Sequence, residues 1–337
     1  MNSFGKIFKV ELFGESHGDS IGVIVDGCPP GLPLSTDDFE PDLARRRSGA
    51  AGTTPRKEQD IPSVLSGIFE GHSTGSPICI VFRNADTRSR DYDQFTAVPR
   101  PGHADFTSQL KYGGFSDPRG SGHFSGRITT GLVAAGVIAK KILSPVKFAT
   151  TIIAAGGQAD IKAAIAAAAN DDDSVGALVE TRVSGLPAGL GEPFFDACEC
   201  VIAHAVFAVP AIRGVEFGDG FAAATMRGSV HNDPFVDAQG TTLKNGAGGI
   251  NGGITNGNEI VVRAAVKPTS SIAKPQTTFD FKRGVMTERI IEGRHDACIA
   301  LRSAVVIEAA IAIALADLSL TAIATAPQSG NKEWRNI

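Results

Sequence analysis

The sequence has few cysteines, and they are scattered. Cys28, Cys79, Cys198, Cys200 and Cys298 are spread over 337 residues. An odd, dispersed set of this kind does not form the disulfide framework of a small secreted protein. Cys198 and Cys200 are separated by a single residue, which is a poor spacing for zinc, and no second pair follows. The sequence therefore predicts reduced, mostly buried thiols and no zinc site.

An excess of positive charge and long hydrophobic runs are also missing. The formal net charge is −4, so bulk electrostatics gives no support for a nucleic-acid or anionic-membrane partner. No uninterrupted apolar run of about 18 residues occurs early in the chain. The opening MNSFGKIFKVELFG lacks the apolar core of a secretory signal. We therefore expect a soluble, cytoplasmic protein with no nucleic-acid and no membrane partner.

Two nucleotide-binding signatures are absent as well. KPTSS (Lys267–Ser271) supplies an amine and three hydroxyls that suit a phosphate, but its lysine does not follow a glycine as in a Walker loop. No GxGxxG turn follows the first strand-like run, so a nucleoside triphosphatase and a Rossmann dehydrogenase are disfavoured. The His103/Asp105 and His295/Asp296 pairs have generic spacings without an evident third ligand, and we expect no metal there.

Glycine, in contrast, is abundant: the 39 glycines indicate many tight turns and close backbone approaches. No Pro/Ser-rich linker or internal repeat divides the chain, so residues 1–337 are expected to form one domain. On this pattern alone we expect an α/β domain with long, functional glycine loops. Strand-like runs lie at Ile21–Val25, Ile78–Phe82, Ala177–Val183 and Ile260–Val266. Helix-like runs lie at Leu132–Ile142, Asp160–Ala169, Phe194–Phe207 and Cys298–Leu318.

Charge is unevenly distributed along the chain. The segment 45–127 carries twelve lysines and arginines against eight aspartates and glutamates, inside a protein that is acidic as a whole. A basic region of this kind suits a small polyanionic ligand. The three consecutive arginines Arg45, Arg46 and Arg47 repel one another unless an anion or acidic neighbours relieve them.

Two histidines lie in glycine-flanked turns beside short polar residues. GESHG (Gly14–Gly18) contains His17, and RPGHAD (Arg100–Asp105) contains His103. Histidine exchanges protons near neutral pH, so the pair, with the arginine-rich segment between them, indicates acid–base chemistry on an anionic substrate. Either histidine alone would more often be an ordinary surface or core residue.

Two further segments carry signals of their own, one for binding an oxyanion and one for the start of a helix. The glycine-rich loop GSGHFSGR (Gly120–Arg127) precedes a helix-like run and would expose backbone N–H groups to an oxyanion, although many such loops only turn the chain. GRHDACIALR (Gly293–Arg302) opens the long C-terminal helix-like run. There, on the residues alone, Asp296 is better read as an N-cap than as a catalytic group.

Taken together, these segments resemble the chorismate synthase family, and they cover the chain from its first strand to its final helix. The motifs occur in the order typical of that family: GESHG, RRR, TTPRKE, LSGIFEG, RSRDY, RPGHAD, LPAGLGEP, GVEFGDGF, GGITNG, KPTSS and GRHD. The resemblance implies an α+β fold, a layered β-α-β sandwich, assembled as a homotetramer.

The resemblance also implies a reaction. The family converts 5-enolpyruvylshikimate 3-phosphate to chorismate in the shikimate pathway of aromatic amino-acid biosynthesis, by anti-1,4-elimination of phosphate. It requires reduced FMN (FMNH2) without net redox change. The flavin lends electron density to the leaving phosphate, whereas the protein supplies position and charge.

The roles of individual residues follow from the matched motifs. His17 would protonate the departing phosphate, His103 would protonate or stabilise the reduced flavin, and Asp296 would work with flavin N5 in removing the ring proton. Ser16 would support the site. Substrate phosphate and carboxylates would meet arginines, which bind them in bidentate fashion: Arg46, Arg100 and Arg127. Flavin contacts would come from His123, Phe124, Ser125, Pro210, Ala211, Gly252, Lys267, Pro268, Thr269, Ser270, Ser271 and Arg294.

The chain departs from the family pattern in several places. The stretch usually written R-S-S-A-R-E-T is HFSGRIT here, and the segment after Arg47 is shortened and lacks an arginine. The alternative is therefore a flavin- or anion-binding protein that keeps the fold but not the elimination. NADPH is needed only if the chain reduces its own flavin. The shortened segment after Arg47 favours reduction of the flavin by a separate reductase.

Overall fold

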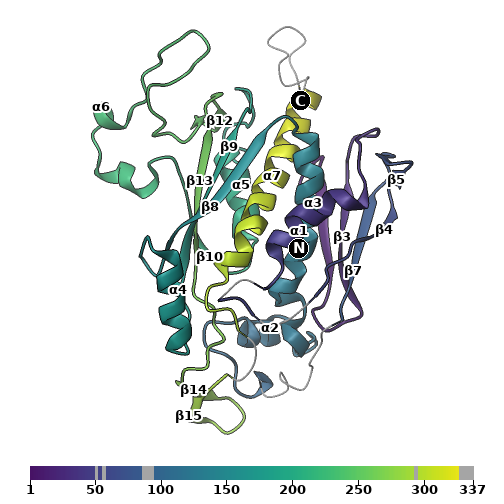
Figure 1. Ribbon diagram of the computed structural model, residues 1–337, viewed down its shortest axis with the longest axis vertical. Helices are drawn as coiled ribbons and strands as arrows, with labels where there is room; N and C mark the ends of the chain where they lie inside the picture. The colour runs from purple at the N-terminus through teal and green to yellow at the C-terminus, as the bar shows by residue number, and fades with distance from the viewer. Residues whose placement is uncertain (50–51, 55–57, 86–94, 292–294, 326–337) are drawn as a thin grey trace.

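Two sheets flank a layer of helices in the computed structural model (Figure 1), which describes the chain except for residues 50–51, 55–57, 86–94, 292–294 and 326–337. The first sheet has the strand order β1 (Ser3–Phe4), β2 (Lys9–Gly14), β3 (Ser20–Asp26), β7 (Ile78–Arg83), β4 (Ser63–Ser66). The second has the order β10 (Ile212–Phe217), β13 (Ile260–Val266), β9 (Ala177–Ser184), β8 (Lys147–Ala155).

Neighbouring strands in both sheets pair antiparallel. This confirms the α+β layered sandwich that the family resemblance implied. The α/β arrangement expected from the strand-like and helix-like runs alone is wrong, because run periodicity does not report strand direction.

Four helices fill the middle layer: α1 (Glu40–Arg46), α3 (Thr129–Ile142), α5 (Cys198–Phe207) and α7 (Ala300–Thr325). Helix α3 packs on β2 and β3, and α7 packs on β8 and β9, so each sheet buries its inner face against a helix. The remaining helical elements are η1 (Thr36–Phe39), α2 (Asp105–Lys111), η3 (Arg119–Phe124), η4 (Gly126–Ile128), α4 (Ile161–Asn170), η5 (Gly220–Thr225) and α6 (Gly228–His231). Three small hairpins pair β5 (Ile68–Phe69) with β6 (His72–Ser73), β11 (Ile250–Asn251) with β12 (Ile254–Thr255), and β14 (Gln276–Asp280) with β15 (Val285–Arg289).

Helix α7 is apolar nearly all round because protein surrounds it. It contacts α1, α3 and α5 as well as β8 and β9. Of the helices in the described ranges, α7 alone is long and apolar enough to cross a membrane, and 78% of its most apolar window is buried inside the protein. This is the burial expected of a core helix.

Helices α3 and α7 approach each other closely in the helix layer. A Cβ placed on Gly136 of α3 would lie 2.4 Å from the Cβ of Ala309 on α7. Two small residues facing each other therefore let the two backbones meet. The contact holds α3, and with it the loop that precedes α3, at a fixed position against α7.

The predicted elements agree best with the structure in the middle of the buried strands. Strand β13 has the predicted bounds, β7 and β9 are each one residue longer at one end, and β3 is one residue longer at both ends. Helix α5 begins at Cys198, four residues later than predicted, because Phe194 and Phe195 lie exposed in the preceding loop.

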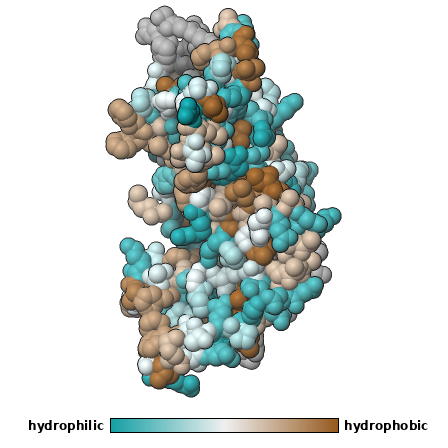
Figure 2. All heavy atoms as spheres, turned by 90° about the vertical axis from the view of Figure 1, so that its left-hand side faces the viewer, coloured by the Kyte–Doolittle hydropathy of each residue, from teal (hydrophilic) through white to brown (hydrophobic). Residues whose placement is uncertain are grey.

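The outer face of the four-stranded sheet is open to solvent. Figure 2 shows this side of the molecule, where hydrophilic and hydrophobic residues are interspersed. Ion pairs between neighbouring strands account for part of its polar surface: Arg263 Nε lies 2.6 Å from Glu216 Oε1, and Arg263 Nη1 lies 3.3 Å from Glu180 Oε2. An antiparallel sheet with one buried and one solvated face shows this alternation.

Candidate active site

A cleft of about 300 Å³ gathers residues from loops that are far apart in the sequence. Its lining includes most of the residues that the sequence analysis named, together with others. The predicted residues that line it are His17, Arg46, Arg100, His103, Phe124, Ser125, Arg127, Pro210, Ala211, Lys267, Pro268, Thr269, Ser270, Ser271 and Asp296. The charged lining residues in the described ranges are six basic (Arg46, Arg47, Arg100, Arg127, Lys267, Arg302) and three acidic (Glu58, Asp60, Asp296), so the cleft attracts anions.

His17 lies in the turn after β2, where its ring is held against a glycine. A Cβ on Gly120 would lie 2.4 Å from His17 Cδ2, so only a glycine lets this backbone pass the imidazole. Gly120 also has a φ of +59°, in the left-handed region that favours glycine. The adjacent Ser16 is fully buried, and its N–H donates to Gly122 O at 3.1 Å. His17 is 8% exposed and faces the cleft.

His103 and Arg100 share one carboxylate. His103 Nδ1 lies 2.7 Å from Asp105 Oδ1, and Arg100 donates to both Asp105 oxygens, from Nη2 at 2.7 Å and from Nε at 2.8 Å. Burial alone would raise the pKa of Asp105, but the hydrogen bonds from Arg100 and His103 hold it well below its usual range. The ionised Asp105 accepts a hydrogen bond from His103 Nδ1, and His103 Nε2 lies 3.3 Å from Arg100 Nη2.

Arg100 is fixed by further contacts on every side. Its Nη1 donates to Ser271 Oγ at 3.1 Å and its Nη2 to Ser121 Oγ at 2.7 Å. The guanidinium also lies over the ring of Phe95, 4.4 Å from the ring centroid. The RPGHAD turn, the GSG loop and the KPTSS segment are therefore joined through this one side chain.

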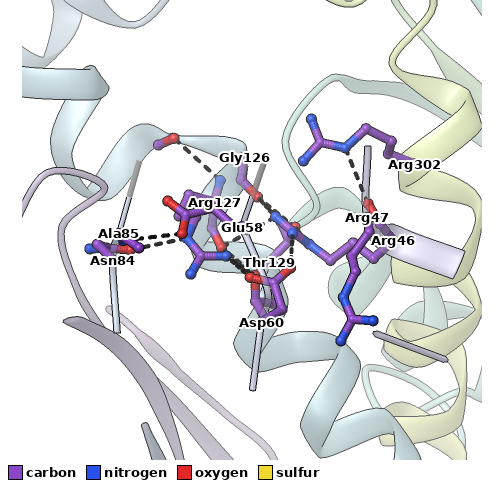
Figure 3. A network of polar contacts seen from close by, with 12 residues as sticks. Arg46, Arg47, Glu58, Asp60, Asn84, Ala85, Gly126, Arg127, Thr129 and Arg302 are labelled. Carbon is purple, nitrogen blue, oxygen red and sulfur yellow. Dashed lines mark hydrogen bonds and ion pairs between the residues drawn. The ribbon is translucent and has the colours of Figure 1, made fainter. Parts of the chain in front are cut away.

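Arg46 and Arg127 form a second buried cluster, shown in Figure 3. Both guanidiniums bind the carboxylate of Asp60, Arg46 Nη1 at 3.3 Å and Arg127 Nη1 in a shorter contact. Arg46 also donates to Gly126 O at 2.7 Å, and Arg127 to Asn84 Oδ1 at 3.0 Å. These contacts tie the end of α1 to the loop that leads into α3.

The three consecutive arginines are relieved by acidic neighbours from three different places. Arg45 binds Glu308 of α7 through two bonds of 2.8 Å, and Arg46 binds Asp60. Arg47 binds Glu40 through bonds of 2.6 and 2.7 Å. The sequence analysis named an anion or acidic neighbours as the groups that could offset the repulsion between the three arginines, and acidic neighbours are present. Arg46 and Arg47 also line the cleft.

Asp296 points into the cleft and does not cap α7. Its Oδ1 accepts from the N–H of Thr54 at 2.8 Å, and its Oδ2 accepts from Arg302 Nη1 at 3.2 Å. Helix α7 begins four residues later, at Ala300. The cap prediction is therefore wrong, because a long-range partner, the Thr54 amide, takes the carboxylate.

The KPTSS segment forms another wall of the cleft. Lys267 Nζ donates to Gly102 O at 2.7 Å, next to His103. Burial, with the nearby charge of Arg213, lowers the pKa of Lys267. Two hydroxyls of the lining, on Thr269 and Ser303, are buried without a hydrogen-bond partner among the described residues.

A second, more apolar cavity of about 480 Å³ adjoins the cleft and shares part of its lining. The shared residues are His103, Phe124, Ser125, Thr129, Pro210, Ala211 and Lys267. A basic space next to an apolar one fits a planar ring with a phosphate tail, and the orphaned hydroxyls of Thr269 and Ser303 offer donors to it. The residues present therefore fit a flavin mononucleotide beside an anionic substrate.

The predicted site residues that the cleft does not include fall into three groups. Ser16 lies behind His17, and His123 turns away, its Nδ1 2.9 Å from Gly14 O, to line the adjoining cavity. Gly252 lies in the turn between β11 and β12 and lines neither cavity. Arg294 lies outside the described residues, as does the RSRDY motif.

Sequence reasoning missed several residues of the cleft. Asp60 and Ser303 stood in no motif, whereas Asp105 stood inside RPGHAD and Arg302 inside GRHDACIALR without being given a role. Their positions depend on contacts between segments far apart in the chain. Only the local arginine excess hinted that acidic partners were needed. Within the part of the chain that the structure describes, no group of three or more His, Cys, Asp or Glu is placed to hold a metal ion.

The sandwich fold and its anion-attracting cleft define an enzyme that acts on a small molecule. A family model described as chorismate synthase matches residues 8–320. A chorismate synthase from Chitinophaga pinensis is 56% identical over 337 residues, all of both chains. One from Dehalococcoides mccartyi is 45% identical, over 95% of this chain and 97% of the relative. A solved structure described as a crystal structure of chorismate synthase matches with a TM-score of 0.73 at 27% identity, covering 94% of this chain and 93% of the other.

The chain therefore belongs to the chorismate synthase family. By that membership it is a carbon–oxygen lyase of aromatic biosynthesis.

Proposed function

We propose that the chain eliminates phosphate from 5-enolpyruvylshikimate 3-phosphate to give chorismate, as an anti-1,4-elimination that depends on reduced FMN without net redox change. The observation that carries the proposal is the meeting of His17, His103 and Asp296 in one cleft with three arginines. These are the groups that the elimination of a phosphate and a ring hydrogen requires.

His17 and Asp296 are the proposed proton-handling groups. His17 faces the cleft and would protonate the departing phosphate oxygen. Asp296 would take part in removing the ring hydrogen as a proton, oriented by the Thr54 amide and Arg302. Ser16, buried behind His17, would keep the turn in place.

Arginines would hold the substrate anions. Arg100 lies 2.7 Å from Asp105 and 3.1 Å from Ser271, so its direction is fixed before a ligand arrives. Arg46 and Arg127 also line the cleft and add positive charge to it. Positioned guanidiniums in a largely buried site stabilise negative charge more strongly than they would in water.

Reduced FMN would be held by the residues shared between the two cavities and by the KPTSS wall: His103, Phe124, Ser125, Pro210, Ala211, Lys267, Pro268, Thr269, Ser270 and Ser271. When bound, the flavin supplies the electron density that makes the unactivated carbon–oxygen bond breakable. His103 would protonate or stabilise the reduced flavin, with its ring held by the contact of Nδ1 with Asp105. His123, Gly252 and Arg294 remain predicted flavin contacts.

We further propose one domain over residues 1–337, a homotetramer and a cytoplasmic location. The single-domain proposal is supported by a continuous hydrophobic core that runs from Phe8 to Leu318. We also propose that an outside reductase supplies FMNH2, so that oxidised FMN with NADPH alone would not support turnover.

The test is an anaerobic assay with chemically reduced FMN, the enolpyruvyl phosphate substrate and the purified chain, following chorismate absorbance and phosphate release. Equal amounts of both products support the lyase. If neither product forms while FMN and substrate bind, the chain keeps the fold without the elimination, and the HFSGRIT loop is then the first segment to restore. A His17→Ala variant with full turnover would overturn the assigned acid.

A further inference from the structure

Asp60 is an acidic side chain at the centre of a basic site, and the sequence motifs give it no role. It lines the cleft, is 4% exposed, and lies directly between Arg46 and Arg127 (Figure 3). One carboxylate oxygen accepts from each guanidinium. Its backbone has a φ of +53°, in the left-handed region where aspartate is tolerated but glycine is preferred.

The two arginines are held by protein groups at every nitrogen. Arg46 donates from Nε to Thr129 Oγ1 at 3.1 Å and from Nη2 to Gly126 O at 2.7 Å, in addition to its bond with Asp60. Arg127 donates from Nε to Asn84 Oδ1 at 3.0 Å. Their side chains are each 3% exposed, so neither charge is relieved by solvent.

Two buried guanidiniums that face each other repel strongly unless an anion lies between them. We propose that Asp60 is that anion: a positioning residue that occupies the place of a ligand oxyanion between Arg46 and Arg127 and keeps both side chains in the binding arrangement before any ligand enters. The proposal rests on the proposed function only in treating this cleft as the anion site.

The proposal predicts that an external anion replaces the missing carboxylate. In Asp60→Gly the backbone conformation is retained, because glycine accepts the positive φ, and a space opens between the guanidiniums. Inorganic phosphate should then stabilise the variant at a concentration about tenfold lower than it stabilises the wild type, a difference of about 1.4 kcal/mol. Thermal unfolding of the purified full chain over a phosphate series, without substrate or flavin, measures this.

Two further variants distinguish the effect of removing the Asp60 charge from the effect of opening space between the guanidiniums. Asp60→Asn removes the charge but fills the same volume, so it should lose stability and respond to phosphate less than Asp60→Gly. Glu216→Gln removes a carboxylate from Arg263 on the four-stranded sheet, where neither residue lines the cleft, and it should respond to phosphate as the wild type does. Sodium chloride at equal ionic strength corrects for general screening.

The outcomes are distinct from those of the turnover assay. If Asp60→Gly folds only with phosphate, or responds to it as stated, the proposal stands even where no chorismate forms. If phosphate stabilises Asp60→Gly no more than the wild type, or no more than chloride does, the proposal is wrong. An Asp60→Gly chain that stays unfolded in saturating phosphate also contradicts it.

Discussion

His103 Nδ1 lies 2.7 Å from Asp105 Oδ1, and the same carboxylate receives two hydrogen bonds from the Arg100 side chain. One acidic group therefore orients both the histidine that we propose acts on the flavin and the arginine that we propose binds substrate anions. Because the pKa of Asp105 is held below its usual range, this carboxylate stays charged through the neutral range.

Replacing Asp105 with asparagine should lower kcat/KM by about tenfold to a hundredfold, since hydrogen bonds to a charged group are worth about 1.5–3 kcal/mol. The loss should appear in both kcat and KM, because His103 and Arg100 are released together. Steady-state kinetics with reduced FMN measures the two parameters. Asp38→Asn, which removes a carboxylate from a partly exposed ion pair with Lys141, serves as the control. Equal kinetics for the two variants would contradict the role given to Asp105.

Glu308 should make stability depend on pH. Burial alone would raise its pKa, but Arg45 and Lys140 lower it to about 2. A lowered folded-state pKa means that Glu308 contributes stability above its ordinary value of 4.5 and loses it as the pH falls toward 2. Glu308→Gln should cost about 3 kcal/mol at pH 7, the low end for a buried pair because Arg45 is partly exposed.

Urea unfolding at pH 7 and below pH 4.5 measures the effect of Glu308→Gln. The difference in the free energy of unfolding between variant and wild type should be smaller at the lower pH. Asp171→Asn, at an exposed ion pair with Lys274, should change stability by less than about 1 kcal/mol at both values. If the difference in the free energy of unfolding does not depend on pH, the carboxylate charge of Glu308 is not what stabilises the helix layer.

Gly136→Ala should destabilise the helix layer although alanine is the better helix former by about 1 kcal/mol. The added methyl would lie 2.4 Å from the Cβ of Ala309, and overpacking of this kind costs about 1–3 kcal/mol or more. The double variant Gly136→Ala/Ala309→Gly removes the contact with the Ala309 Cβ but leaves the added methyl 2.7 Å from the Cα of residue 309, so it should recover only part of the loss. Thermal unfolding of the three chains tests this, and no recovery in the double variant would argue against a direct clash.

Ser303→Ala should weaken ligand binding by about tenfold, because its buried hydroxyl lines the cleft without a partner among the described residues and can donate to an anion there. Ser319 provides a matched control: it lies on the same helix and is also buried and unpartnered within the described ranges, but it does not line the cleft. Titration with substrate and with FMN measures the affinity of each variant. Identical affinities for Ser303→Ala and Ser319→Ala would remove Ser303 from the site.

Much of the fold was predictable where burial dictates the residue pattern. The run Ile260–Val266 is branched and apolar, because β13 lies in the middle of a sheet with one face against the helix layer, and its bounds were predicted without error. The helix-like run Cys298–Leu318 was predicted as well, and α7 extends from Ala300 to Thr325. The exposed start of the predicted helix at Phe194 was misjudged, since periodicity does not distinguish an exposed apolar loop from a helix turn.

The sequence by itself determined the family, the buried helix and strands, and the chemical character of the site, because these depend on residue types and on short motifs. Only the tertiary structure decided which acid pairs with which base. Glu308, Asp60 and Glu40 each relieve one of three consecutive arginines, and Asp296 binds Thr54 instead of capping its own helix. Such pairings join segments separated by up to hundreds of residues. They follow from how the layers pack, which local sequence does not encode.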